Sequence, residues 1–242
     1  MKTDPSMPTA TEEIRLVDGY AVGGTLQDGI DGNYDFSISD VIKEAWQKTD
    51  GVKGTFWGAW ILTVIVTVIV TVIFGVIFGF KEISPFVEMF FRLIVNLVLI
   101  PIFVGLMMIG VRRSVELPIR FSIIFDYFGY TIPIVIAAFL ISIFVIIGLV
   151  ALIIPGIYLG LAYFFTMLLI VEKNLGFWEA MEASRKTVTH HWFKVFFTLF
   201  IMYIILFISM FLLFIPLIWT IPMWFNVIGI LYRIMFGVEA AS

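Results

Sequence analysis

Three polar residues inside an otherwise apolar run are the first candidates for chemistry in this sequence. Glu88, Arg92 and Asn96 are spaced four residues apart, so they share one face of a helix, with the glutamate in the favourable position before the arginine. Ionisable residues inside a membrane segment are expensive and indicate a functional site by default. Two interpretations follow: a polar cavity or solute site, or a structural pair in which Arg92 extends toward Glu88 at the membrane interface.

Other residue types that carry catalysis or metal binding are scarce. The chain has no cysteine, and its two histidines, His190 and His191, are adjacent and point about 100° apart on a helix, a poor geometry for a shared metal. The pair Met107 and Met108 is expected to fill packing gaps rather than bind a soft metal. No HExxH, GxSxG or Walker-type pattern is present. We therefore expect no enzymatic activity, no cofactor and no metal site.

The composition identifies the environment in which any such residues work. The chain has 242 residues, of which 61% are hydrophobic and 14% charged, and its mean hydropathy is +1.08. Soluble domains are usually about half apolar and a quarter charged, so the excess predicts an integral membrane protein. The net charge of −3 gives no reason to expect a nucleic-acid partner.

The segment from Thr131 to Val171 contains no Asp, Glu, Lys, Arg or His. As one helix it would measure roughly 60 Å, about twice the thickness of a bilayer core. It must therefore cross twice, and Pro155-Gly156 is where we expect it to reverse, because proline cannot continue a helix and glycine tolerates a turn.

Along the rest of the chain, similar apolar runs predict an all-α integral membrane fold of six transmembrane helices arranged as three hairpins. The expected spans are about 55–80, 86–110, 132–153, 157–171, 192–215 and 217–236. A cytoplasmic interfacial amphipathic helix is expected before each hairpin, beginning near Ser37, Phe121 and Gly176. Residues 1–36 are polar and glycine-rich and are expected to be a mobile cytoplasmic tail, and 237–242 a cytoplasmic C-terminal end.

Small residues recur at every fourth position of the first span and predict a helix-contact face. Its central members are Thr63, Thr67, Thr71, Gly75 and Gly79. Small residues at this spacing let another helix approach closely. Packing within the chain and docking of another protein are both open interpretations.

Basic residues are distributed asymmetrically between the expected loops. Among the loops on the far side of the membrane only the first carries one, Lys81, whereas the near side carries Lys2, Arg15, Lys43, Lys48, Lys53, Arg112, Arg113, Arg120, Lys173, Arg185, Lys186, Lys194 and Arg233. Because cytoplasmic loops are enriched in Lys and Arg, both termini are expected in the cytoplasm.

Two short motifs carry a resemblance. Ile154-Pro155-Gly156 between two spans is followed by a helix with Glu179-Ala180 and Ser184. This combination, over roughly residues 115–236, resembles uncharacterised bacterial membrane proteins of the YciC-like kind and the membrane domain fused to some glycerophosphodiester phosphodiesterases. The resemblance implies a bacterial inner-membrane protein and brings no catalytic residue with it.

Two functions then compete. The first is a non-enzymatic scaffold or accessory subunit, whose partners are membrane lipids and other membrane subunits or a second copy of the chain. The alternative is a transporter of small solutes or lipids that uses the face formed by Glu88, Arg92 and Asn96. An intramembrane enzyme ranks behind both.

Overall fold

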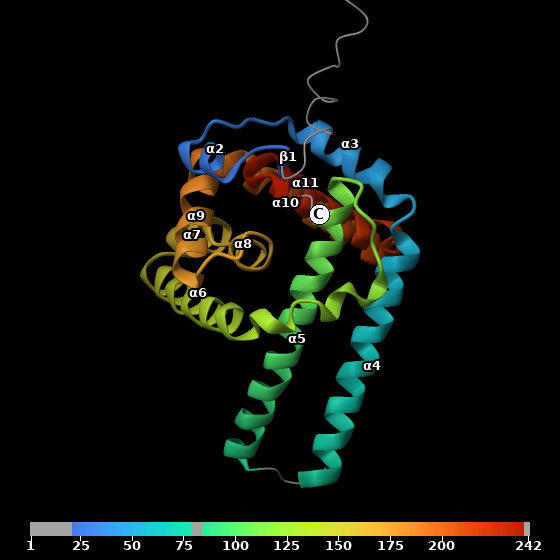
Figure 1. Cartoon of the computed structure of the whole chain (residues 1–242). Coiled ribbons are helices and arrows are strands. Elements are labelled where there is room, and N and C mark those ends of the chain that lie inside the picture. The colour runs from blue at the N-terminus through green and yellow to red at the C-terminus, as the bar shows by residue number, and fades with distance from the viewer. Residues whose placement is uncertain (1–20, 79–83, 240–242) are drawn as a thin grey trace, which may run out of the picture.

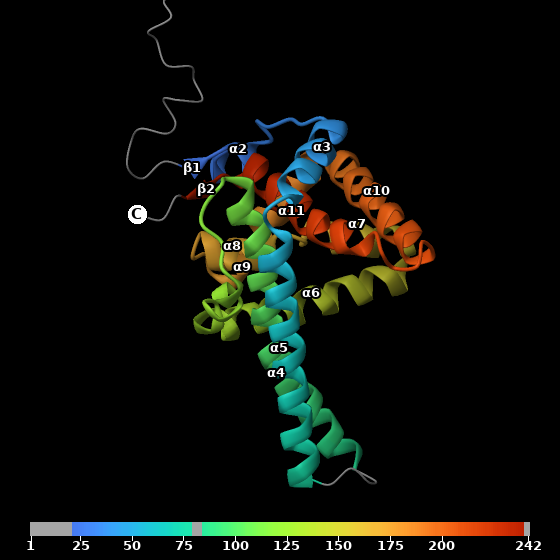
Figure 2. The ribbon, with the colours of Figure 1, turned by 90° about the vertical axis from the view of Figure 1, so that its right-hand side faces the viewer.

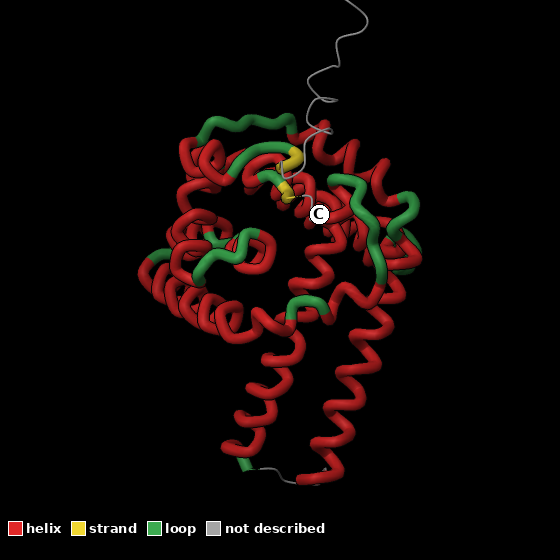
Figure 3. The backbone as a smooth tube through the Cα atoms, in the orientation of Figure 1, coloured by secondary structure: helices red, strands yellow, loops and turns green. Residues whose placement is uncertain are grey.

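The computed structural model describes residues 21–78 and 84–239, and this part of the chain is almost entirely helical (Figures 1 and 3). It contains 6 helical segments long and apolar enough to cross a membrane, as the sequence predicts. The α-helices are α2 (Leu26–Asp31), α3 (Ile38–Thr49), α4 (Lys53–Phe78), α5 (Pro85–Ser114), α6 (Thr131–Ala151), α7 (Ile153–Ala162), α8 (Thr166–Glu172), α9 (Phe177–His190), α10 (Trp192–Phe211) and α11 (Leu217–Phe236). The remaining elements are the 3-10 helices η1 (Phe121–Phe125) and η2 (Phe128–Tyr130) and the antiparallel strands β1 (Ala21–Val22) and β2 (Val238–Glu239).

Helices α4 and α5 run side by side and extend well beyond the other helices (Figures 1 and 2). We call residues 60–78 and 85–100 the arm and the rest of the described chain the body. Burial changes along α5 at this boundary: most of the helix from Pro101 to Val111 is buried in the body, whereas no residue of its outer part is. The arm is rich in Val and Ile, yet it is helical, as expected for an apolar segment that crosses a membrane, where a helix satisfies every backbone group within its own segment.

The centre of the body is the crossing of α5 and α11. A Cβ atom added at Gly110 would lie 2.0 Å from the carbonyl oxygen of Phe225, and one added at Gly229 would lie 2.1 Å from the carbonyl oxygen of Gly110. The two backbones are therefore in direct contact, which only glycine permits. The sequence prediction singled out the small residues of α4 and missed these two glycines.

The connection between α6 and α7 is a single residue, Leu152, with extended backbone angles. The predicted reversal at Pro155-Gly156 is therefore displaced by three residues. Pro155 lies in the first turn of α7, where a missing N–H costs little. Gly156 allows close approach to α6, because a Cβ atom added at Gly156 would lie 2.4 Å from Cγ and 2.7 Å from the backbone nitrogen of Leu149. The helix then breaks after Ala162, so the predicted span 157–171 covers the end of α7, residues 163–165 and α8 as far as Val171.

Residues 21–36 do not form the mobile tail that their composition suggested. β1 pairs with β2, and α2 packs against α9 and α11. The apolar side chains of Leu26, Ile30, Tyr34 and Phe36 are partly buried against the core. These four apolar residues are enough to order the segment, because it packs on helices that the rest of the body already holds in place. Residues 1–20 of the predicted tail lie outside the described part of the chain.

The apolar sides expected of the amphipathic helices contact protein in part on α3, where Trp46 is exposed, and over several residues on α9. Val41, Ala45 and Thr49 of α3 are buried, and α3 packs on α11. On α9 the buried residues include Ala180, Ser184 and Thr187, and the helix packs against α2, α7 and α8. The position of these helices at a membrane interface stays a prediction. The middle element consists of two short 3-10 helices rather than one interfacial helix.

Candidate functional site

The polar face of α5 lies on the arm. Arg92 donates from Nε and Nη2 to Oε1 of Glu88 at 3.1 and 2.6 Å, and Asn96 Nδ2 donates to the carbonyl oxygen of Arg92 at 2.7 Å. The structure thus brings the three predicted residues into one chain of hydrogen bonds. The side chains of Arg92 and Glu88 are 74% and 53% exposed, so they form an open surface rather than the lining of a cavity.

The small-residue face of α4 is used partly within the chain. Thr63 is partly buried and Gly75 is buried. Thr67 lies with Val95 and Val98 around a small gap between α4 and α5. Each threonine from Thr63 to Thr71 donates its hydroxyl to the carbonyl oxygen four residues earlier, at 2.8 Å. Thr71 is exposed, and Gly79 lies outside the described residues.

A charged cluster in the body was not predicted. Arg233 of α11 donates from Nη1 and Nη2 to both carboxylate oxygens of Glu44 on α3, at 2.8 Å each, and Nη1 also donates to the carbonyl oxygen of Ser114 at 2.6 Å. Nearby, Arg113 donates to the carbonyl oxygens of Lys48 and Asp50 at the end of α3. Arginine suits this site because its planar group can bind a carboxylate through two parallel bonds. The cluster joins the ends of α3, α5 and α11.

A second unpredicted cluster surrounds Glu172, whose side chain is 6% exposed. Its Oε2 accepts a hydrogen bond from the hydroxyl of Tyr232 at 2.7 Å, and its Oε1 accepts one from the backbone N–H of Glu239 at 2.7 Å. The ammonium of Lys173 lies 3.4 Å from Glu172 and 3.1 Å from the Glu239 carboxylate. Glu172 therefore links α8 to α11 and β2.

Sequence reasoning could place the residues of both clusters at helix ends but could not pair them. Glu172 and Tyr232 are 60 positions apart, and Glu44 and Arg233 are 189 apart. Their positions just beyond apolar runs are the available signal, and that signal indicates a boundary, not a partner.

Ser184, which carried part of the resemblance, has a definite structural role. Its hydroxyl donates to the carbonyl oxygen of Ala162 at 2.7 Å and accepts from the backbone N–H of Phe165 at 3.3 Å. These two backbone groups flank the break between α7 and α8. A buried serine thus replaces hydrogen bonds that the break removes, as buried backbone groups require.

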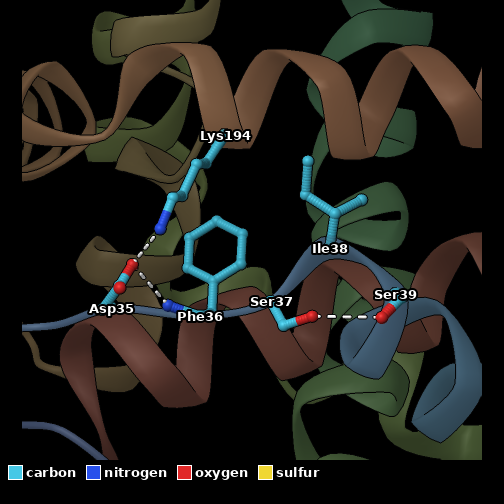
Figure 4. A pocket seen from close by; sticks show the side chains of 6 residues that line it. All are labelled: Asp35, Phe36, Ser37, Ile38, Ser39 and Lys194. Atoms are coloured by element: carbon cyan, nitrogen blue, oxygen red, sulfur yellow. Dashed lines mark hydrogen bonds and ion pairs between the residues drawn. The ribbon is translucent and has the colours of Figure 1, made fainter.

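A shallow hollow of about 630 Å³ lies between the start of α3 and Lys194 at the start of α10 (Figure 4). Lys194 donates to Asp35, and Phe36, Ser37, Ile38 and Ser39 complete the lining. This bond holds the pKa of Asp35 below its ordinary value. It therefore stabilises the fold above the ordinary aspartate pKa, and the contribution is lost as acidification protonates the folded form.

The two histidines make separate contacts with residues 30–34. His190 Nε2 lies 3.0 Å from the carbonyl oxygen of Ile30, and the ring of His191 packs edge-on against Tyr34. Burial raises the pKa of Tyr34, whose hydroxyl donates to the carbonyl oxygen of Thr187. Within residues 21–78 and 84–239, no three His, Cys, Asp or Glu side chains are grouped as metal ligands would be.

A comparison of the chain with protein-family models, with curated proteins and with solved structures finds no match. Function must therefore be inferred from the geometry of the chain itself.

Proposed function

We propose that this chain is a multi-pass integral membrane protein with a structural role, as a scaffold or accessory subunit of a membrane complex. The observation that supports this proposal is the outer side of α4 in the arm. Exposed Val and Ile residues form an apolar stripe along it, which includes Val64, Ile65, Val68, Ile69, Val72, Ile73, Val76 and Ile77. Exposed apolar surfaces of this extent indicate a lipid or protein contact.

Purification from membranes tests the proposal. The protein should resist extraction at alkaline pH, dissolve in mild detergent, and co-purify with a membrane protein in a fixed ratio. Ile69→Trp should lower the amount of partner that co-purifies, because the larger side chain projects from the stripe into the contact. Leu93→Trp, at an exposed position of α5, should leave the ratio unchanged. Release at alkaline pH would contradict membrane integration, and purification with lipid alone would contradict the subunit role.

The proposed location is the bacterial cytoplasmic membrane, with both termini in the cytoplasm. Every Lys and Arg of the described residues except Arg92 lies outside the arm, in the body, and basic residues favour the cytoplasmic side. Reporters fused at Met1 and Ser242 should both read as cytoplasmic, and one inserted at Ser84 as external. A cytoplasmic signal at Ser84 would contradict this orientation.

Kinship with the YciC-like membrane proteins remains part of the proposal. The hydrogen bonds of Ser184 to the break between α7 and α8 give a physical reason for a serine at this distance along the chain from Pro155-Gly156. It supports a shared architecture and assigns no substrate.

Transport of a small solute or lipid is the second candidate, and the hydrogen-bonded face on α5 is the observation that favours it. If Glu88 and Arg92 form only an interfacial pair, Arg92→Leu should be tolerated, and the double replacement with Glu88→Leu should cost no more than about 1 kcal/mol, as exposed pairs do. Thermal unfolding in detergent measures this cost. An Arg92→Leu protein that inserts and folds but loses a solute-dependent growth phenotype would instead favour transport.

A further inference from the structure

We infer that α10 and α11 do not cross the membrane but lie in the leaflet on the basic side, with the aromatic side of α10 facing lipid acyl chains. The inference rests on the proposed function, because it takes α4 and α5 as the helices that cross. Three contacts along α11 lead to it.

The first contact is at the start of α11. The ammonium of Lys53 lies over the ring of Trp219, 5.6 Å from its centroid, and Trp57 Nε1 donates to the carbonyl oxygen of Ile218 at 3.2 Å. Lys53 and Trp57 are in the first turns of α4. A helix rises about 1.5 Å per residue, so Lys53 is roughly 38 Å from Phe78 at the far end of the arm. Six parallel spans would instead place the start of α11 near that far end.

The other two contacts are at the middle and the end of α11. Gly229 touches the backbone of α5 at Gly110. Along α5, Gly110 is roughly 33 Å from Glu88, which lies near the outer end of the arm. Arg233 donates to the carbonyl oxygen of Ser114, the last residue of α5. All three points of α11 therefore meet the basic ends of α4 and α5. If α4 and α5 cross the membrane, α11 lies across their ends, as Figure 2 also shows.

Helix α3 supports the same placement. Asn226, in the middle of α11, donates to the carbonyl oxygen of Ala45 and lies within hydrogen-bond distance of Thr49, and both of these residues are buried. The neighbouring residues of α3 include Lys43, Glu44 and Lys48. Charges at this density do not lie in hydrocarbon, so the helix that packs along α3 must lie at the level of the headgroups.

The exposed side of α10 fits the acyl chains of one leaflet. Its aromatic residues recur at helical spacing along the whole helix and are exposed, namely Phe193, Phe197, Phe200, Tyr203, Phe207 and Phe211. Aromatic side chains are favoured where a helix lies in the interface with its apolar side in the acyl boundary. We call these six residues the aromatic side of α10.

The turn between α10 and α11 is apolar and strained. Leu213 and Phe214 have positive φ angles of 57° and 62°, and their exposed fractions are 81% and 62%. On the far side of a membrane these side chains would face water. In the near leaflet the side chains of Leu213 and Phe214 reach the acyl chains. The irregular backbone of the turn stays close to the headgroups, where water can bond its unpaired N–H and C=O groups.

Cysteine pairs in native membranes test the inference, because the chain has no cysteine of its own. A short bifunctional thiol reagent should cross-link Lys53→Cys to Trp219→Cys and should not cross-link Ser84→Cys to Trp219→Cys. An impermeant maleimide added outside should label Ser84→Cys, and it should label Leu213→Cys about tenfold less, because the turn is shielded from the external water. Gln47→Cys, exposed on α3, should be labelled only after permeabilisation.

The outcomes separate this inference from the proposed function. Labelling of Leu213→Cys from outside together with Ser84→Cys, or failure of the Lys53–Trp219 cross-link in folded protein, would overturn the placement of α10 and α11 and leave the membrane-crossing arm intact. Labelling of Ser84→Cys and Gln47→Cys from the same side would overturn the crossing arm itself.

Discussion

Replacing Gly110 with leucine is expected to prevent the body from folding. The first added carbon alone would lie 2.0 Å from the carbonyl oxygen of Phe225 and 2.6 Å from its carbonyl carbon. Overpacking usually costs about 1–3 kcal/mol when side chains can shift. Here the obstacle is backbone, so we expect a loss above about 3 kcal/mol, a large share of the roughly 5–15 kcal/mol that holds a domain together. Little folded protein should be recovered in mild detergent.

Alanine variants provide the matched comparison. Gly110→Ala should lower the midpoint of thermal unfolding, followed by circular dichroism in detergent. Gly160→Ala in α7 has only a contact at 4.0 Å with Val145, and it should be neutral or raise the midpoint, since alanine is the better helix former by up to about 1 kcal/mol. Equal midpoints for the two variants would refute the backbone contact between α5 and α11.

Glu172→Leu is expected to be the most damaging replacement of a charged residue. It removes the acceptor of the fully buried Tyr232 hydroxyl and of the Glu239 N–H, and it leaves Lys173 with Glu239 alone. Breaking a buried charged pair by removing one partner costs about 3–5 kcal/mol. We expect the midpoint of chemical unfolding to fall accordingly.

A second replacement separates lost hydrogen bonds from lost packing. Glu172→Leu combined with Tyr232→Phe should recover part of the stability, because the hydroxyl left without an acceptor is removed as well. Glu88→Leu on the exposed arm is the control, and it should cost no more than about 1 kcal/mol. If Glu172→Leu were as mild as Glu88→Leu, the cluster around Glu172 would not be a stabilising element.

What the sequence predicted depended on local pattern. The long runs without charge identified the long apolar helices, and the helix expected to begin near Gly176 corresponds to α9, which begins at Phe177. The closeness of Glu88, Arg92 and Asn96 followed from helical periodicity. In each case the deciding residues are within one or two turns of each other, where geometry is fixed by the helix itself.

What the sequence did not predict depends on contacts between distant segments. Nothing near Gly110 indicates that it meets Gly229, and nothing near Glu44 indicates Arg233. Residues 21–36 were misjudged because composition averages hide spacing: Leu26, Ile30 and Tyr34 recur every four residues and could have indicated a packed segment. The tight turn was misplaced because proline is accepted in the first turn of a helix as well as at its end.

The docking of residues 21–36 has a consequence for the order of events during synthesis. Tyr34 and the carbonyl of Ile30 bond to Thr187 and His190, partners that follow 153 and 160 positions later in the chain. Ribosomes add about 5–20 residues per second, so these partners emerge roughly ten to thirty seconds afterwards. During that interval α3, α4 and α5 are already outside the ribosome. If the arm crosses the membrane as proposed, it enters the bilayer while residues 21–36 are still in water, and the body closes as one of the last steps of biogenesis.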